Sequence, residues 1–272
     1  MIFSGWKIGL DIQTEGVRAV AVQKHRQGWQ LRQWWNLPFP SVVFIDNILS
    51  QPAVLLEVLD GWRKQLPRRF RLSVSFPTEL TFQQSIPIPD KNLSAAVREN
   101  YVAYTAAKQL QLPASQLCYD YLEQSDVLKV TASRQSDLNN LLTSLASLQL
   151  YPDTVTPGDK VLYALPEKCN PQTCQYRVHE ESDYWLWASC NHPVASGRQD
   201  KQQCSDLPAL CRWLKSEPEN IAFSTACPGN NASLAVQALD VWRLLTRLYP
   251  PLPQTKGRYT IALGLALGGT HR

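Results

Sequence analysis

The start of the chain constrains the fold most, because it predicts three short strands in immediate succession. Residues Trp6–Leu10 and Val17–Val22 are rich in apolar and β-branched side chains, and they flank a polar turn at Gln13–Gly16. A further segment of the same kind, Trp29–Trp35, ends shortly before two prolines. Polar turns between such runs are typical of an antiparallel meander, so we expect the chain to begin with a small sheet.

Helical and extended patterns alternate after this meander. The spacing of apolar residues predicts helices at Val54–Leu66, Asn92–Leu110 and Leu138–Leu150, and strands at Leu72–Phe76, Cys118–Leu122 and Val127–Ser133. With an extended, proline-marked segment after Phe76, the order up to Leu150 is β, α, β, β, α. Such an order predicts a small inserted α+β lobe within an α/β protein.

The second half has weaker patterns. The best predictions there are a strand at Tyr184–Ala188, helices at Leu207–Lys215 and Ser233–Leu248, and an apolar closing helix or strand at Tyr259–Leu267. A proline-rich linker separates the last two segments.

Composition narrows the functional classes. The 272 residues are 44% hydrophobic and 18% charged, with a formal net charge of +4, which is typical of a globular domain. No apolar run approaches the roughly 18 residues of a membrane span, and no secretory signal is visible. We therefore expect a cytoplasmic protein with reduced thiols. The densest basic stretch, Arg63–Arg71, has two interpretations: a surface for phosphates or anionic lipid headgroups, or a solvated helix end.

The first turn carries the most suggestive polar residues. In phosphate-binding loops a carboxylate holds hydrated magnesium while backbone amides approach the phosphates, and Asp11 and Thr14 suit these roles. Gln13, however, stands where such loops need the close approach that glycine permits. The alternative is a β-turn in which Asp11 and Thr14 bond the local backbone.

Other chemistry has little support. Pairs such as Cys169 with Cys174, Cys190 with His192, and Cys204 with Cys211 could ligate zinc, but none has the tight spacing of zinc knuckles, so we expect structural thiols and no metal. No nucleophile elbow occurs, and we predict no catalytic residue. The paired tryptophans suit a core better than base stacking, so no direct contact with nucleic acid is expected.

Several segments, in order, resemble the PilM family of type IV pilus assembly and DNA-uptake machines, which is actin-like and related to FtsA. They are GLDIQTEGVRAVAV, FIDNI, SVSFPTEL, QQSIPIP, AAVRENYVAY, CYDYLE, VLKVTASRQSDLNNLLTSLASLQLYPDTV and IALGLALGG. The resemblance implies an actin-like ATPase fold with an inserted FtsA/PilM-type α+β subdomain and a reduced second lobe. The implied division is a first-lobe N-terminal part at 1–76, the inserted subdomain at 77–150, a return to the first lobe at 151–165, the second lobe at 166–232, and a C-terminal helix with a closing segment of the first lobe at 233–272.

The resemblance weakens where family members carry a second phosphate loop with Asp-Ile-Gly and a later glycine-rich adenosine motif. The corresponding strands here, Tyr176–Ser182 and Ile221–Ala226, have neither. We therefore expect a degenerate pseudo-ATPase without a cofactor, although the family binds ATP and magnesium. Asp11, Thr14 and Arg18 would form a vestigial phosphate loop. The alternative is an ATP-binding switch or ATPase of pilus assembly.

In the PilM family a groove between the first lobe and the inserted subdomain receives the cytoplasmic tail of a PilN-like inner-membrane protein. By resemblance, this chain is expected to be a scaffold that binds such a tail and contacts the membrane only through that partner. The aromatic candidates for lining the groove are Phe76, Phe82, Tyr101 and Tyr104.

Overall fold

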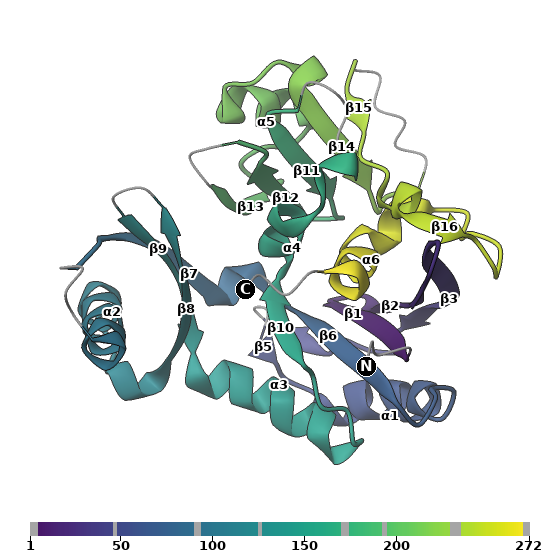
Figure 1. Ribbon diagram of the computed structural model, residues 1–272, viewed down its shortest axis with the longest axis horizontal. Coiled ribbons are helices and arrows are strands. Elements are labelled where there is room, and N and C mark those ends of the chain that lie inside the picture. Colours follow the sequence, from purple (N-terminus) through teal and green to yellow (C-terminus); the bar gives the residue numbers. More distant parts are fainter. Residues whose placement is uncertain are drawn as a thin grey trace.

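The computed structural model describes residues 5–45, 48–89, 94–124, 127–169, 174–191, 195–228 and 235–268 (Figure 1). Its helices are α1 (Pro52–Arg63), α2 (Ala95–Leu110), α3 (Gln135–Ser147), α4 (Gly158–Ala164), α5 (Leu207–Leu214) and α6 (Thr260–Leu267). The strands are β1 (Trp6–Gln13), β2 (Gly16–His25), β3 (Gly28–Pro38), β4 (Phe44–Ile45), β5 (Ile48–Leu49), β6 (Phe70–Phe76), β7 (Thr81–Pro87), β8 (Leu117–Gln124), β9 (Val127–Arg134), β10 (Thr154–Pro157), β11 (Tyr176–Glu180), β12 (Tyr184–Ser189), β13 (Ser196–Asp200), β14 (Ile221–Thr225), β15 (Gln237–Ala238) and β16 (Leu245–Arg247).

The first lobe is built on a six-stranded sheet in the order β10-β6-β1-β2-β3-β16. Strands β1, β2 and β3 pair antiparallel in sequence, which confirms the predicted meander. Both faces are covered, because alternate residues of β2 enter two cores. Val20 and Val22 belong to the core that contains buried residues of α4 and α6, whereas Ala19 and Ala21 belong to the core that contains those of α1 and α3. Strand β6 lies parallel to β1 and brings its C-terminal end beside the turn after β1.

The second lobe is a five-stranded sheet in the order β13-β12-β11-β14-β15. Helix α5 packs on one face of it through Leu207, Leu210 and Leu214. The other face contributes Leu186 and Ala222 to the same core that contains the buried residues of α4 and α6. These two helices therefore lie between the sheets and join the lobes, as Figure 1 shows.

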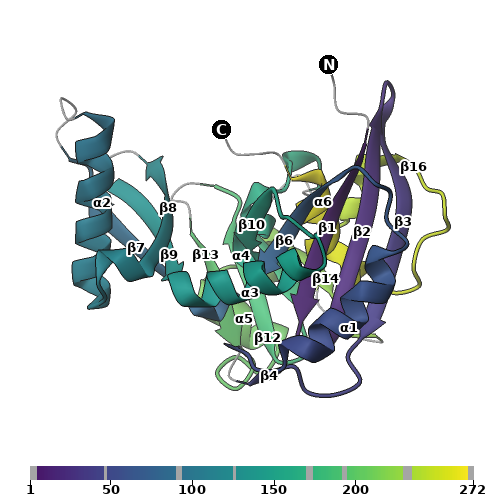
Figure 2. The ribbon, with the colours of Figure 1, turned by 90° about the horizontal axis from the view of Figure 1, so that it is seen from below.

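The inserted unit projects from the side of the first lobe, next to α3 (Figures 1 and 2). It is a three-stranded sheet, β7-β9-β8, with α2 packed on it. The predicted β, α, β, β, α order is confirmed, although α3 buries Leu141 and Leu145 in the first-lobe core rather than under the three-stranded sheet. The structure begins α2 at Ala95 with Ser94 as its cap, whereas the predicted start, Asn92, lies outside the described residues.

One predicted helix, Ser233–Leu248, is wrong. From residue 235 onward the segment forms β15, a 3-10 turn at Val241–Leu244 and β16, while Ser233 lies outside the described residues. The Asp240 carboxylate caps the turn by accepting from the Trp242 amide at 3.1 Å. The pattern misleads because Leu239, Trp242 and Leu245 are buried at helix-like spacing while following an extended path along the core. The closing segment is a helix, α6.

No helix in the described part of the chain is long and apolar enough to cross a membrane.

Candidate functional site

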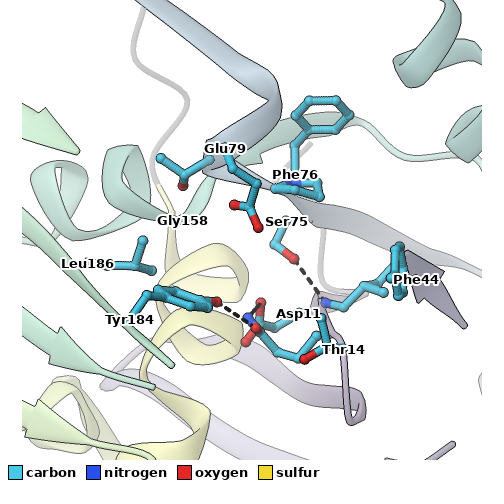
Figure 3. A pocket seen from close by; sticks show the side chains of 13 residues that line it. Asp11, Thr14, Phe44, Ser75, Phe76, Glu79, Gly158, Tyr184 and Leu186 are labelled. Carbon is cyan, nitrogen blue, oxygen red and sulfur yellow. Dashed lines mark hydrogen bonds between the residues drawn. The ribbon is translucent and has the colours of Figure 1, made fainter. Parts of the chain in front are cut away.

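The predicted phosphate loop faces a small cavity between the two lobes (Figure 3). The end of β1, the end of β6 and the start of β12 meet there, and the lining includes Asp11, Thr14, Ser75, Glu79 and Tyr184. The cavity volume is about 40 Å³. Since one water requires roughly 10–15 Å³ of such volume, this is room for a few waters.

Asp11 is fully buried at the floor of this cavity. Its Oδ1 accepts a hydrogen bond from the Gln13 side-chain amide at 2.9 Å, while Oδ2 has no hydrogen-bond partner among the described residues. Burial raises the pKa of the Asp11 carboxyl above its usual value, and the nearby Arg18 charge opposes that rise. The carboxyl is therefore held in an environment that disfavours its ionised form.

Gln13 connects the two lobes. Its side-chain oxygen accepts a hydrogen bond from the Tyr184 hydroxyl at 2.7 Å, and Tyr184 comes from β12 of the second lobe. Burial raises the pKa of Tyr184 well above its usual value, so the hydroxyl stays protonated and remains a donor. The Ile12 amide of the same loop already donates to the Ser75 hydroxyl at 2.9 Å (Figure 3).

A buried ion pair forms the second connection. Arg18 on β2 donates to the Glu181 carboxylate at 2.6 Å, and the side-chain exposure is 4% for each partner. His179 Nε2 donates to the same oxygen at 3.0 Å, while its Nδ1 contacts the Ser224 hydroxyl at 2.8 Å. Burial alone would raise the pKa of Glu181, but the His179 hydrogen bond and the Arg18 charge lower it to about 2. Burial also opposes the charge of Arg18, yet Glu181 raises the pKa of Arg18 further above its usual range.

These residues do not fit magnesium and ATP. The unpartnered Asp11 oxygen could face a hydrated cation, but the Gln13 side chain and the Ile12 amide are already used within the protein. Arg18, predicted as part of the loop, is turned to Glu181 instead of the cavity, and Thr14 is exposed at its rim.

Sequence reasoning missed Glu181, His179 and Tyr184. They lie on or beside the segment Tyr176–Ser182, which lacks the Asp-Ile-Gly of the family. The signal was present as a run of acidic and imidazole side chains, His179–Glu181, within a predicted strand, which the structure shows to be buried. Charges at such positions require buried partners, and Arg18 supplies one.

A second, apolar cavity adjoins the first between the first-lobe sheet and α3. It is lined mainly by Phe44, Ile48, Leu49, Phe76, Leu80 and Leu141. We call the cavity lined by these residues the apolar groove. The short β4–β5 hairpin at its edge also exposes Ile45 (58%) and Ile48 (47%).

Of the four aromatic candidates, Phe76 lies in the apolar groove. Tyr101 packs against the core of the inserted unit and donates to the Pro87 carbonyl at 3.2 Å. Tyr104 is 70% exposed on α2, and Phe82 is half-buried on β7. The structure therefore does not bring these four side chains together.

The cysteines are free thiols in the described part of the chain. Cys174 and Cys190 share a hydrogen bond, whereas His192, paired with Cys190 as a candidate ligand from the sequence, lies outside the described residues. No group of three or more His, Cys, Asp or Glu side chains able to hold a metal occurs among the residues that the structure describes.

Comparisons with known proteins agree with this architecture. The chain is 29% identical to the DNA utilization protein HofM of Escherichia coli (strain K12), over 98% of this chain and 99% of the relative. The fold is similar to that of the PilM–PilN type IV pilus biogenesis complex, with a TM-score of 0.74, 15% identity, and 96% and 97% of the two chains covered. It is also similar to the cytoplasmic domain of EpsL, an inner-membrane component of the Vibrio cholerae type II secretion system, with a TM-score of 0.61, 14% identity, and 97% and 95% covered. No family model matches the sequence.

The fold therefore defines the class: the chain has an actin-like ATPase fold of mixed α/β sheets, with an inserted subdomain. Similarity extends over nearly the whole length in both sequence and structure. The chain therefore has the fold seen in the PilM–PilN complex and resembles HofM in sequence from end to end.

Proposed function

We propose that this protein is a cytoplasmic scaffold of a type IV pilus-like DNA-uptake apparatus, needed for the use of extracellular DNA as a nutrient. In this role it binds the cytoplasmic tail of a PilN-like, HofN-type inner-membrane protein. The observation that carries the proposal is the full-length similarity to HofM together with the match to the PilM–PilN complex. The protein is held at the inner membrane through that partner.

The apolar groove is the place that suits such a tail. It lies where the first-lobe sheet meets α3, and the exposed hairpin residues Ile45 and Ile48 extend it to the surface. Asp137 and Asn140 of α3 add polar groups to the same lining. An extended peptide can place alternate apolar side chains in such a groove while polar groups fix its position.

The test is calorimetric titration of the protein with a peptide of the cytoplasmic N-terminus of the neighbouring inner-membrane protein. Ile48→Asp should weaken binding at least about tenfold, because it places a charge in an apolar contact. Val97→Asp is the matched control, since Val97 is 48% exposed on α2 against 47% for Ile48. No binding by the unaltered protein would overturn the proposal. If Tyr104→Ala weakens binding of the peptide and Ile48→Asp does not, the tail binds at α2 instead of the apolar groove.

We also propose that the protein neither binds nor hydrolyses ATP. The support is the pair of interlobe connections, Gln13–Tyr184 and Arg18–Glu181, which use the groups that a phosphate would need. A ligand present at 100 times its dissociation constant stabilises the native state by about 2.7 kcal/mol, so millimolar magnesium ATP provides a sensitive test. We expect no change in the melting temperature. A clear rise would favour the ATP-binding switch, and tail binding that appears only with ATP would do so more strongly.

A further inference from the structure

One end of the first-lobe sheet gathers positive charge from several elements. Because β2 runs antiparallel to β1 and β6 runs parallel to it, the start of β1, the β2–β3 turn and the start of β6 lie at the same end. Helix α1 precedes β6, so the segment that joins them leads to this end of the sheet. We name the following residues the basic end: Lys7, Lys24, Arg26, Arg32, Arg63, Lys64, Arg68, Arg69 and Arg71.

Acidic side chains offset little of this charge. Asp60 pairs with Lys64 at 2.6 Å, and both side chains are well exposed. Asp153 accepts from the Leu72 amide at 2.9 Å and lies close enough to Lys7 to influence its pKa. The remaining cations of the basic end outnumber these two carboxylates, so the net field at this end is positive.

The cations at this end are crowded against one another. Lys7 and Lys24 both lie over the Trp29 ring, with Nζ at 5.1 Å and 5.5 Å from its centroid. Lys7 is also directly opposite Arg71 in the β1–β6 pairing. Burial, then the charges of Arg71 and Lys24, lower the pKa of Lys7 from its usual value. A polyanion placed against this end would relieve the repulsion.

We infer that the basic end is a docking surface for an anionic membrane, which gives the protein a direct contact with lipid headgroups in addition to any contact through a partner. A lipid surface requires charge density on an exposed surface, without base-edge or groove complementarity. Arg68 and Arg69 provide exposed charge of this kind in the α1–β6 turn.

The alternative polyanion, nucleic acid, has less support here. Aromatic rings at this end already have cations over their faces: Arg32 over Trp6 at 5.7 Å and Arg63 over Phe70 at 5.3 Å. These ring faces are therefore not open to stack on bases. Helix α1 lies along the sheet with Trp62 buried beneath it, so it does not project as a groove-reading helix.

The test is co-sedimentation of the full-length protein with vesicles. We expect binding to vesicles of equal parts phosphatidylglycerol and phosphatidylcholine, little binding to pure phosphatidylcholine, and loss of binding between about 0.1 M and 0.5 M salt. Neutralising three charges, Arg68→Gln, Arg69→Gln and Arg71→Gln, should weaken the apparent partition constant on the order of 100-fold. The control carries three neutralised charges elsewhere: Lys108→Gln, Arg212→Gln and Lys215→Gln, all at exposed positions.

Equal losses in the two triple variants, or no sedimentation with anionic vesicles, would overturn the inference. Binding to duplex DNA without binding to vesicles would also overturn it and assign the surface to nucleic acid. The basic end and the apolar groove lie at opposite ends of β1, so the basic-end variant should keep its affinity for the tail peptide. Failure of this inference is thereby distinguishable from failure of the proposed function.

Discussion

Asp11 is the residue of the predicted phosphate loop whose burial opposes folding. Its side chain is fully buried, and Oδ2 has no hydrogen-bond partner among the described residues. A carboxyl whose pKa is raised on folding binds protons more tightly in the native state, so its ionisation at neutral pH opposes folding.

Asp11→Asn should therefore stabilise the protein by about 1 to 3 kcal/mol at neutral pH, because the amide carries no charge to desolvate. The gain should be largest where Asp11 is ionised and shrink as the pH falls through its raised native-state pKa. Urea unfolding of both proteins at several pH values measures this difference. Glu217→Gln, at an exposed position, is the control, and a destabilised D11N at neutral pH would contradict the expectation.

The Arg18–Glu181 pair affects stability in the opposite direction, because ionisation of its carboxylate favours folding. Since the pKa of Glu181 is lowered to about 2, its contribution is present above the unfolded pKa of roughly 4.5 and is lost as the pH falls toward 2. Glu181→Gln should cost about 3 to 5 kcal/mol by leaving Arg18 buried without its partner.

A double variant, Arg18→Met with Glu181→Met, should recover much of that loss, because both buried charges are then removed. The exposed pair Lys64–Asp60 provides the comparison: Asp60→Asn should cost less than about 1 kcal/mol. Chemical denaturation in a double-mutant cycle measures both pairs. Equal losses of unfolding free energy in E181Q and D60N would show that burial does not strengthen the Arg18–Glu181 pair.

At the scale of elements, Gly9 allows β1 and α6 to approach each other closely. A Cβ placed on Gly9 would lie 1.9 Å from the Ala262 carbonyl oxygen and 2.7 Å from the Ala266 amide. The strand and the helix therefore touch through their backbones, and α6 could not seat between the lobes beside a larger residue.

Gly9→Ala should destabilise the protein by about 1 to 3 kcal/mol or more through overpacking. Gly61 in α1 is the matched control, since an added Cβ there would meet no atom within 4 Å apart from its chain neighbours and the adjacent backbone of its own helix. Gly61→Ala should stabilise by roughly 0.5 to 1 kcal/mol through helix propensity. Thermal denaturation of the two variants measures this contrast, and similar melting temperatures would refute the close contact.

Local sequence patterns predict some elements of this fold and fail for others. The meander and the inserted unit follow from local patterns, since strand alternation and turns specify them within a few residues. The Leu239–Leu245 segment defeats the same reasoning, because its apolar spacing reflects a path across the core. Asp11 was identifiable from its turn, but its link through Gln13 to Tyr184 joins residues far apart in the chain, and no local pattern specifies such a contact.

At the scale of the whole molecule, the buried cores predict an uneven distribution of stability. The core shared by the two lobes extends over β2, β12, β14, α4 and α6. The inserted unit relies on a much smaller set of fully buried side chains: Ile86, Val102, Ala106, Leu128 and Val130. Regions with few buried apolar contacts open at lower free energy than the global unfolding transition.

Native-state hydrogen exchange should therefore show α2 and β8 opening together at a lower free energy than β1 and α6. Val102→Ala should lower the opening free energy of α2 and β8 by roughly 1 kcal/mol or more, because it removes buried methyl groups. Protection of β1 should hardly change, since Val102 has no part in the first-lobe core. Uniform protection in all elements, or an equal loss in β1, would mean that the inserted unit unfolds only with the rest of the molecule. If the inserted unit unfolds only with the rest, a tail bound in the apolar groove would stabilise the whole molecule as one cooperative unit. If the inserted unit opens first, the tail would bind a first lobe that stays folded during that opening.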